Sequence, residues 1–109
     1  MIDEIREKIR ARRYEFSRHA LDQSIIRDIP VADLEEALSG ELEVIENYPD
    51  DKYGPSCLLL GFTSAGRPLH VVCSYPSRPL VKIITLYEPD QEEWTDNRIR
   101  RESEKVDRP

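Results

Sequence analysis

The amino-acid sequence predicts an α+β fold, in which N-terminal helices pack on one face of a curled antiparallel sheet of about four strands. Three observations support this fold class. Apolar residues recur every three or four positions through about residue 39, as they do on the buried face of a helix. After this point the apolar residues recur at a period of about two, which is typical of strands. Short turns join these apolar runs. A chain of 109 residues fits a single domain over residues 1–109.

The first predicted helix covers residues 1–13 and is amphipathic. Ile2, Ile5 and Ile9 lie at helical spacing, and basic residues fill many of the positions between them. Two interpretations of this basic face remain open. It is either a solvated helix surface or a phosphate-binding edge. The second interpretation depends on four arginines that gather in this part of the sequence: Arg10, Arg12, Arg13 and Arg18.

A second helix is predicted after Ser17. The hydroxyl of a serine N-cap can accept a hydrogen bond from an unpaired amide of the first helical turn. This assignment places His19 in the first turn and ends the helix near Asp28, because a residue that precedes a proline resists the helical conformation. Three apolar side chains are expected to face the core: Ala20, Leu21 and Ile25.

Residues 31–39 predict a third helix, on which Leu34 and Leu38 recur at helical spacing. The four predicted strands follow at residues 42–48, 57–62, 69–75 and 80–87. Short connections between successive strands favour an antiparallel meander. Cys57 and Cys73 lie within the apolar runs, so we expect them to pack in the core rather than to form a disulfide or a metal site.

The last segment, residues 89–109, is dense in charges of both signs. Trp94 is the only large apolar residue in its first part. We expect a short helix from about Gln91 that docks through Trp94, followed by a frayed end.

The composition limits the class of protein. The net charge is −6 and the pI is about 4.9, which argues against a protein that coats nucleic acid non-specifically. A local basic patch on an acidic body remains compatible with these values. No apolar stretch approaches the roughly 20 residues that span a membrane, and the charged N-terminus lacks the apolar core of a signal peptide. The expected location is the cytoplasm.

Few polar residues interrupt the structured segments. Histidine is the natural candidate for proton transfer, because its free pKa lies nearest neutrality. His70 falls on the strand face opposite Leu69 and Val71, where it either meets a ligand or serves as a hydrogen-bonded structural residue. The same two alternatives apply to His19. The candidates within these segments are His19, Arg27, His70, Lys82, Thr85 and Tyr87.

Arg27 follows His19 by eight residues, a little over two helical turns. The two side chains are therefore expected on roughly the same helix face, where they could bind an anion. The sequence has no Ser-His-Asp pattern, no glycine-rich phosphate loop and no metal-ligand spacing. No cofactor and no metal are expected.

Three short motifs carry a resemblance to a known family. They are Phe-Ser-x-His-Ala at residues 16–20, Gly-Arg-Pro-Leu-His-Val-Val at residues 66–72 and Thr-x-Tyr-x-Pro at residues 85–89. In this order they resemble the family known as domain of unknown function 4258, over about residues 14–95. The resemblance implies a fold like that of the compact RelE-like and BrnT-like bacterial toxins, which are ribonucleases of toxin–antitoxin pairs. It also implies RNA as a substrate and a small zinc-finger antitoxin as a partner.

The resemblance suggests a metal-independent cleavage of RNA. His19 or His70 would be the base that takes the proton of the 2′-hydroxyl. Arg27 and Lys82 would stabilise the charge of the phosphorane, a contribution often worth ~3 kcal/mol for one well-placed donor. Tyr87 would stack on a base or act as the acid.

Four residues would bind the substrate, and Lys82 would serve in both roles. These are Arg13, Arg18, Lys82 and Thr85, with the first helix supplying a local basic strip. Relatives commonly carry a second arginine in the helix after the His-Ala pair, where this chain has Gln23. If that arginine binds phosphate, the activity of this chain is weakened or absent. A second hypothesis is therefore a catalytically silent module of the same fold, which binds protein or RNA. Its oligomeric state is left open.

Overall fold

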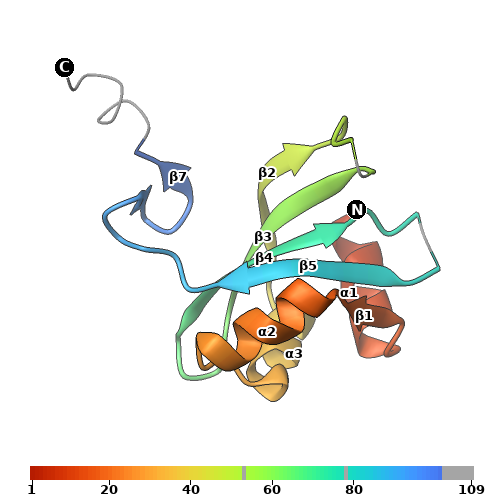
Figure 1. The fold of residues 1–109 in the computed structure, drawn as a ribbon, viewed down its shortest axis with the longest axis horizontal. Helices are drawn as coiled ribbons and strands as arrows, with labels where there is room; N and C mark the ends of the chain where they lie inside the picture. Colours follow the sequence, from red (N-terminus) through yellow and green to blue (C-terminus); the bar gives the residue numbers. More distant parts are fainter. Residues whose placement is uncertain (53, 78, 102–109) are drawn as a thin grey trace.

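The computed structural model describes residues 1–52, 54–77 and 79–101 (Figure 1). The three predicted helices are α1 (Ile2–Arg10), α2 (Arg18–Ile26) and α3 (Val31–Ser39). The strands are β1 (Tyr14–Phe16), β2 (Glu43–Tyr48), β3 (Ser56–Phe62), β4 (Pro68–Ser74), β5 (Val81–Tyr87), β6 (Trp94–Thr95) and β7 (Ile99–Arg100). The helices lie together on one face of the main sheet, whereas the β6–β7 hairpin lies away from them (Figure 1). The fold class is therefore α+β, as predicted.

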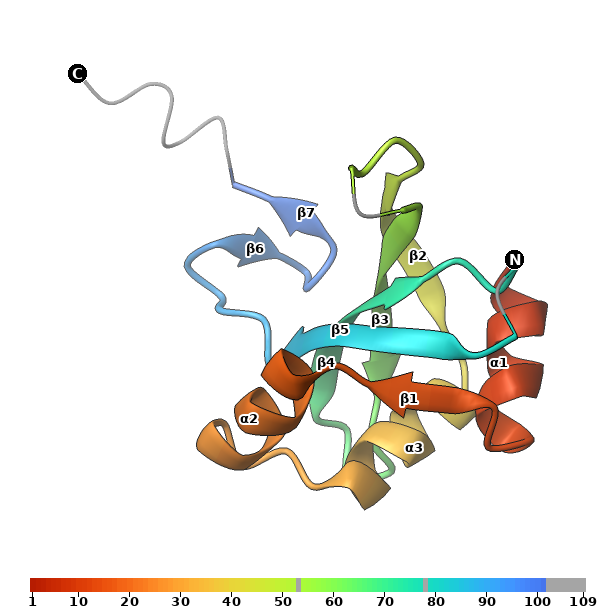
Figure 2. The ribbon, with the colours of Figure 1, turned by 45° about the vertical axis from the view of Figure 1, so that its right-hand side comes forward.

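The main sheet has five strands in the order β1-β5-β4-β3-β2. The four predicted strands pair antiparallel, as expected. The prediction of about four strands is corrected by β1, which runs parallel to β5 with Tyr14 opposite Val81 (Figure 2). The sequence did not indicate β1, because three residues are too few to show a period of two and the partner strand lies far along the chain.

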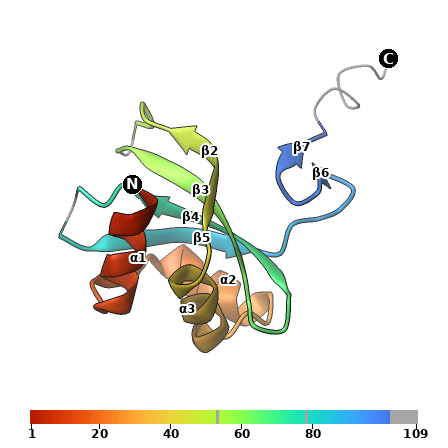
Figure 3. The ribbon, with the colours of Figure 1, turned by 180° about the vertical axis from the view of Figure 1, so that it is seen from behind.

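The first helix ends at Arg10 rather than at residue 13. Arg12 has a left-handed backbone with φ of 60°, which turns the chain out of α1. Arg6 Nε donates to the carbonyl of Gly40 at 2.8 Å, and Arg10 Nη2 donates to that of Ser39 at 2.7 Å. These bonds satisfy carbonyls that the end of α3 leaves unpaired. Part of the basic face therefore holds α1 against α3, and Figure 3 shows the two helices side by side.

The core lies between the helices and the sheet. Its buried apolar side chains come from all three helices, the α2–α3 connection and strands β3, β4 and β5: Ile5, Ile9, Ala20, Ile29, Leu34, Ala37, Leu38, Cys57, Leu59, Leu69, Val71, Cys73, Val81, Ile83 and Leu86. Both cysteines are free and buried in this core, as predicted. Their sulfur atoms face each other across β3 and β4 at 3.9 Å.

The C-terminal segment forms a hairpin instead of the predicted short helix. Asp96 and Asn97 both have positive φ in the turn that joins β6 to β7, and these two residue types tolerate that conformation well. Trp94 docks as predicted, because its side chain is 2% exposed. It packs against His70, which lies opposite the buried Leu60 of β3. Residues 102–109, where the frayed end was expected, lie outside the described residues.

Two arginines fasten the hairpin to β2. Arg98 pairs with Glu43 at 2.8 Å, and Arg100 donates to both carboxylate oxygens of Glu46, at 2.6 and 3.0 Å. Burial would raise the pKa of Glu46, but the hydrogen bonds from Arg100 and Tyr48 outweigh it and lower the pKa. Ion pairs to β2 and the buried Trp94 side chain therefore hold the hairpin on the sheet.

The outer face of α2 differs from the prediction. Ala20 is buried as expected, but Leu21 is 45% exposed and Ile25 is 79% exposed. The reason is that α2 lies along β5, held by the Ser17 hydroxyl at its start and by the Arg27 side chain at its end, so the apolar side chains of its other face point outward. No helix in the described part of the chain is long and apolar enough to cross a membrane.

Candidate functional site

Ser17 fixes the position of the second helix on the sheet. Its hydroxyl accepts a hydrogen bond from the amide of Ala20 at 3.0 Å, which confirms the predicted N-cap. The same hydroxyl donates to the carbonyl of Ile84 on β5 at 2.8 Å. A serine N-cap typically stabilises a helix by about 1 kcal/mol. Here it also places His19, two residues later, beside β5.

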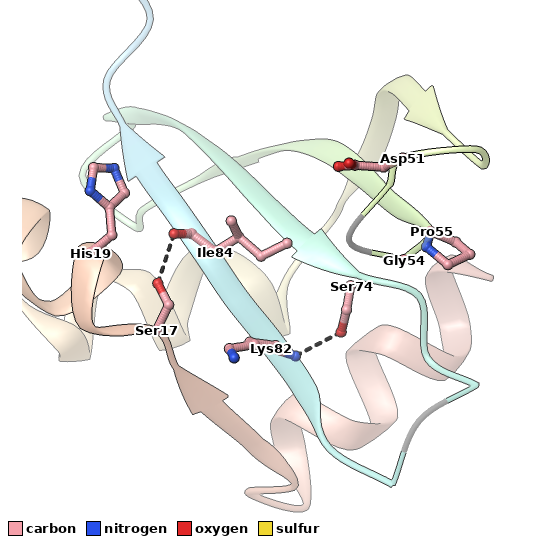
Figure 4. A pocket seen from close by; sticks show the side chains of 8 residues that line it. All are labelled: Ser17, His19, Asp51, Gly54, Pro55, Ser74, Lys82 and Ile84. Carbon is pink, nitrogen blue, oxygen red and sulfur yellow. Dashed lines mark hydrogen bonds between the residues drawn. The ribbon is translucent and has the colours of Figure 1, made fainter.

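A cavity of about 460 Å³ opens next to this anchor. It is lined by eight residues from α2, the loop before β3, β4 and β5: Ser17, His19, Asp51, Gly54, Pro55, Ser74, Lys82 and Ile84. Figure 4 shows the side chain of Ile84 between His19 and Lys82. The cavity therefore combines an apolar floor with an imidazole, an ammonium group, a carboxylate and two hydroxyls.

His19 and Lys82 are the candidate functional groups of this cavity. Both residues are exposed, and no hydrogen bond or ion pair within the described residues engages either the imidazole or the ammonium group. The backbone amide of Lys82 donates to Ser74 Oγ at 2.9 Å, so the strand itself is held in place. A base and a cation that are free to meet a ligand can bind and activate an anionic group.

His70 does not reach this cavity. It lies on the predicted face of β4, but it is fully buried beneath the hairpin. Its Nε2 lies 2.6 Å from the carbonyl of Asn97, and its Nδ1 lies 3.3 Å from the Tyr87 hydroxyl. A carbonyl only accepts, so Nε2 carries the proton and Nδ1 accepts from Tyr87. The ring of Trp94 packs edge-on at 4.5 Å. Of the two alternatives for His70, a ligand contact or a structural role, this geometry favours the structural role.

Burial lowers the pKa of His70 below its usual value, although the hydrogen bond to Asn97 opposes the shift. We expect the free energy of unfolding to fall as the pH drops below about 6.5, the ordinary pKa of histidine. In that range the unfolded chain binds a proton that the folded chain excludes. One proton can contribute at most about 1.4 kcal/mol per pH unit.

Urea unfolding of the wild type and of His70→Gln, from about pH 8 to about pH 5, measures this contribution. The difference between the two proteins cancels the other titrating groups. The variant should show a shallower pH dependence, and equal slopes would contradict the prediction.

Arg27 and Tyr87 belong to a different cavity, of about 540 Å³. Arg27 ends α2, donates to the carbonyl of Leu86 at 3.0 Å and lies 5.6 Å from the centre of the Tyr87 ring. Acidic side chains share the lining of this cavity, and one of them, Glu88, pairs with Arg67 at 2.6 Å. His19 and Arg27, which were expected on roughly the same helix face, therefore line two different cavities.

The other predicted residues lie apart from the cavity floor. Arg13 is exposed and directly precedes β1, where its carbonyl accepts from the amide of Val81 at 3.1 Å. Arg18 is exposed at the start of α2, and Gln23 is half-buried on the same helix. Thr85 is half-buried on β5, opposite Val72. The described residues contain no group of three or more histidine, cysteine, aspartate or glutamate side chains that could hold a metal ion.

The lining residues that were not predicted as functional include Asp51, Ser74 and Ile84. The period of two along β4 could have indicated Ser74, because it alternates with His70 on the face opposite the core. Ile84 alternates with Lys82 along β5 and therefore lies on the same open face, beside the point where the register between β4 and β5 shifts by one residue. No pattern in the sequence indicated that the loop containing Asp51 folds over β4.

The model of the family described as Domain of unknown function (DUF4258) matches residues 16–88. The chain belongs to the DUF4258 family. The match runs from the end of β1 to just beyond β5, so it contains both His19 and Lys82, whereas α1 and the β6–β7 hairpin lie outside it. No curated protein and no solved structure matches this DUF4258 chain.

Proposed function

We propose that this DUF4258 domain is a metal-independent endoribonuclease that works in the cavity of about 460 Å³. The observation that carries the proposal is the presence of an unengaged imidazole, His19, and an unengaged ammonium group, Lys82, in one cavity. Ile84 separates them on an apolar floor that suits the ribose or base of a nucleotide (Figure 4). Arg27, Tyr87 and the buried His70 take no part in this scheme.

The reaction follows from these two groups. His19 takes the proton of the 2′-hydroxyl, and the 2′-oxygen forms a bond to phosphorus while the bond from phosphorus to the 5′-oxygen breaks. The departing 5′-oxygen takes a proton from water. Lys82 stabilises the negative charge that develops on the phosphorane oxygens. The products are a 2′,3′-cyclic phosphate and a 5′-hydroxyl.

Substrate binding must overcome a net charge of −6. Lys82 supplies positive charge at the cavity, and Arg13 adds more at the neighbouring edge of the sheet. Thr85 lies further along β5, beyond Ile84, where it could contact the strand of RNA. Local positive charge of this kind gives binding that weakens steeply with added salt.

The biological setting of the proposal comes from the family resemblance. A helical layer on a small sheet is the arrangement of RelE-like and BrnT-like toxins, so we propose a cytoplasmic toxin that a small zinc-finger antitoxin neutralises. Gln23, in place of the arginine common in relatives, favours the alternative in which the domain binds RNA or protein without cleaving.

Replacing Lys82 with glutamine is expected to lower kcat/KM for RNA cleavage by about 10²-fold, the usual effect of removing one charge-stabilising donor. Cleavage of a short labelled RNA in the presence of a chelator measures the effect. Arg12→Gln is the matched control, because it removes one positive charge from an 83% exposed side chain outside the cavity.

The same strand made as DNA tests the chemistry, because it lacks the 2′-hydroxyl and should stay intact. Purified protein that binds the RNA but leaves it whole would overturn the nuclease and support the silent binding module. Intact cellular RNA and normal growth after induced expression, with no antitoxin present, would have the same meaning.

A further inference from the structure

Cys57 and Cys73 place two thiol groups in contact inside the core. The two residues are directly opposite each other on the antiparallel strands β3 and β4, and their Sγ atoms lie 3.9 Å apart. Both residues are 0% exposed, and the two thiols share a hydrogen bond. They are the only cysteines of the chain. The proposed cleavage of RNA uses neither of them.

The register of β3 and β4 already meets the main geometric requirement of a disulfide. Directly opposite residues of an antiparallel pair have Cα atoms about 4.5 or 5.5 Å apart. Two cysteines can be bridged when their Cα atoms are about 4.4–6.8 Å apart. The pairing runs along the whole of β3 without a register shift, so the opposite placement of Cys57 and Cys73 is fixed. Rotation of the two side chains therefore suffices to join the sulfur atoms.

The cysteine pair lies near an end of the strand ladder. A single pair of residues, Ser56 and Ser74, follows it before the ladder ends, and Figure 4 shows Ser74 at this end of β4. The pairing of β4 with β5 is also irregular between Val72 and Cys73. Strand ends and irregular pairs open locally at a lower free energy than the centre of a sheet. A small oxidant can therefore reach the sulfur atoms when this end opens briefly.

We propose that Cys57 and Cys73 form a reversible redox site, which a peroxide oxidises to a disulfide. Burial favours this class of oxidant, because hydrogen peroxide is small and uncharged. A bulky disulfide would instead have to bring a third sulfur atom into the packed core. Disulfides of cytosolic proteins, where they occur, are usually transient and redox-sensing. The redox site does not depend on RNA cleavage.

Cys57 is the thiol that reacts first. Its hydrogen bond with Cys73 lowers the pKa of Cys57, whereas the same bond and burial raise the pKa of Cys73. The nucleophile is the thiolate. The Cys57 sulfur forms a bond to one peroxide oxygen, and the bond between the two oxygens breaks. The second oxygen leaves as hydroxide and becomes water with the proton that the thiol released, so Cys57 is now a sulfenic acid.

The second step joins the two residues. The Cys73 sulfur forms a bond to the Cys57 sulfur, and the bond from sulfur to oxygen breaks. The hydroxyl group leaves as water with the proton of the Cys73 thiol. The two sulfur atoms have then given two electrons to the peroxide, which has become two molecules of water. A dithiol reductant returns the electrons and restores both thiols.

The first test counts free thiols after treatment of the folded protein with hydrogen peroxide. Once the peroxide is removed, the chain is unfolded, alkylated and weighed. The wild type should change from two labels to none while it keeps the mass of a single chain, and a dithiol reductant should restore both labels. Because the chain has only these two cysteines, this result identifies the bond.

The second test separates the roles of the two thiols. Cys73→Ala should stop at the sulfenic acid of Cys57, which dimedone traps as a stable adduct. Its matched variant, Cys57→Ala, should form such an adduct at least about tenfold more slowly, because the remaining thiol is the weaker acid. Circular dichroism confirms that both variants are folded. The thiol count of the wild type stands without them.

The third test is the thermal unfolding of the oxidised and reduced wild type. The disulfide closes a short loop in the unfolded chain, so the Tm should rise on oxidation by at least about 5 °C. Three results would overturn the proposal. They are thiols that peroxide leaves fully labelled, lost labels that a dithiol reductant does not restore, and a Tm that falls on oxidation. The last would mean that the bond distorts the fold.

Discussion

Replacing Trp94 with alanine is expected to lower the free energy of unfolding by about 3–5 kcal/mol, the range for removing a large buried aromatic side chain. Its ring is 2% exposed and packs edge-on against His70 at 4.5 Å. The guanidinium of Arg100 covers the ring at 4.7 Å from its centre. The substitution would leave a void between the hairpin and the sheet and would expose His70 and Leu60 to water.

Urea unfolding followed by circular dichroism measures this effect. Ile99→Ala is the matched control, because it changes an exposed apolar side chain of the same hairpin and should alter stability by about 0.5 kcal/mol at most. Trp94 is the only tryptophan of the chain, so its fluorescence in the wild type reports directly on hairpin docking. A loss below about 1 kcal/mol for Trp94→Ala would show that the hairpin contributes little to the folded state.

Replacing His19 with alanine is expected to lower kcat/KM for RNA cleavage by about 10²- to 10⁴-fold, the usual contribution of a general base. His19 is exposed, and its side chain makes no hydrogen bond or ion pair within the described residues. The variant should therefore unfold within about 0.5 kcal/mol of the wild type. The loss of activity would then be chemical rather than structural.

Imidazole added to the solution distinguishes a base from a positioning residue, because it can replace a missing side chain that transfers a proton. Added imidazole should restore part of the lost rate of RNA cleavage in His19→Ala. It should not increase the rate of Lys82→Gln. An unchanged rate in His19→Ala would place the base elsewhere and would remove the main support for the proposed mechanism.

The elements that depend on local pattern were predictable from the sequence. Residues 31–39 form α3 as predicted, because Leu34 and Leu38 repeat at helical spacing and both face the core. The strands from β2 to β5 agree with their predicted ranges to within one residue at each end. The pleat also placed His70 on the correct face of β4, opposite Leu69 and Val71.

Features that depend on distant contacts were not predictable in the same way. The alternation of side chains along β4 could not indicate what covers His70. The covering residue, Trp94, belongs to the β6–β7 hairpin, which follows the last strand of the main sheet in the sequence. The charged segment around Trp94 was predicted as a helix. Asp96 and Asn97 are nevertheless residue types that favour a turn. The separation of His19 from Arg27 depends on how α2 lies on β5, which helical periodicity does not determine.

The hydroxyl of Ser17 joins the helix cap to the sheet through one oxygen atom. Any change that shifts α2 along β5 must break one or both of these bonds, and it must also carry His19 away from Ile84. A substitution at position 17 that changes the stability of the helix start would therefore also change the position of His19 in the proposed reaction centre.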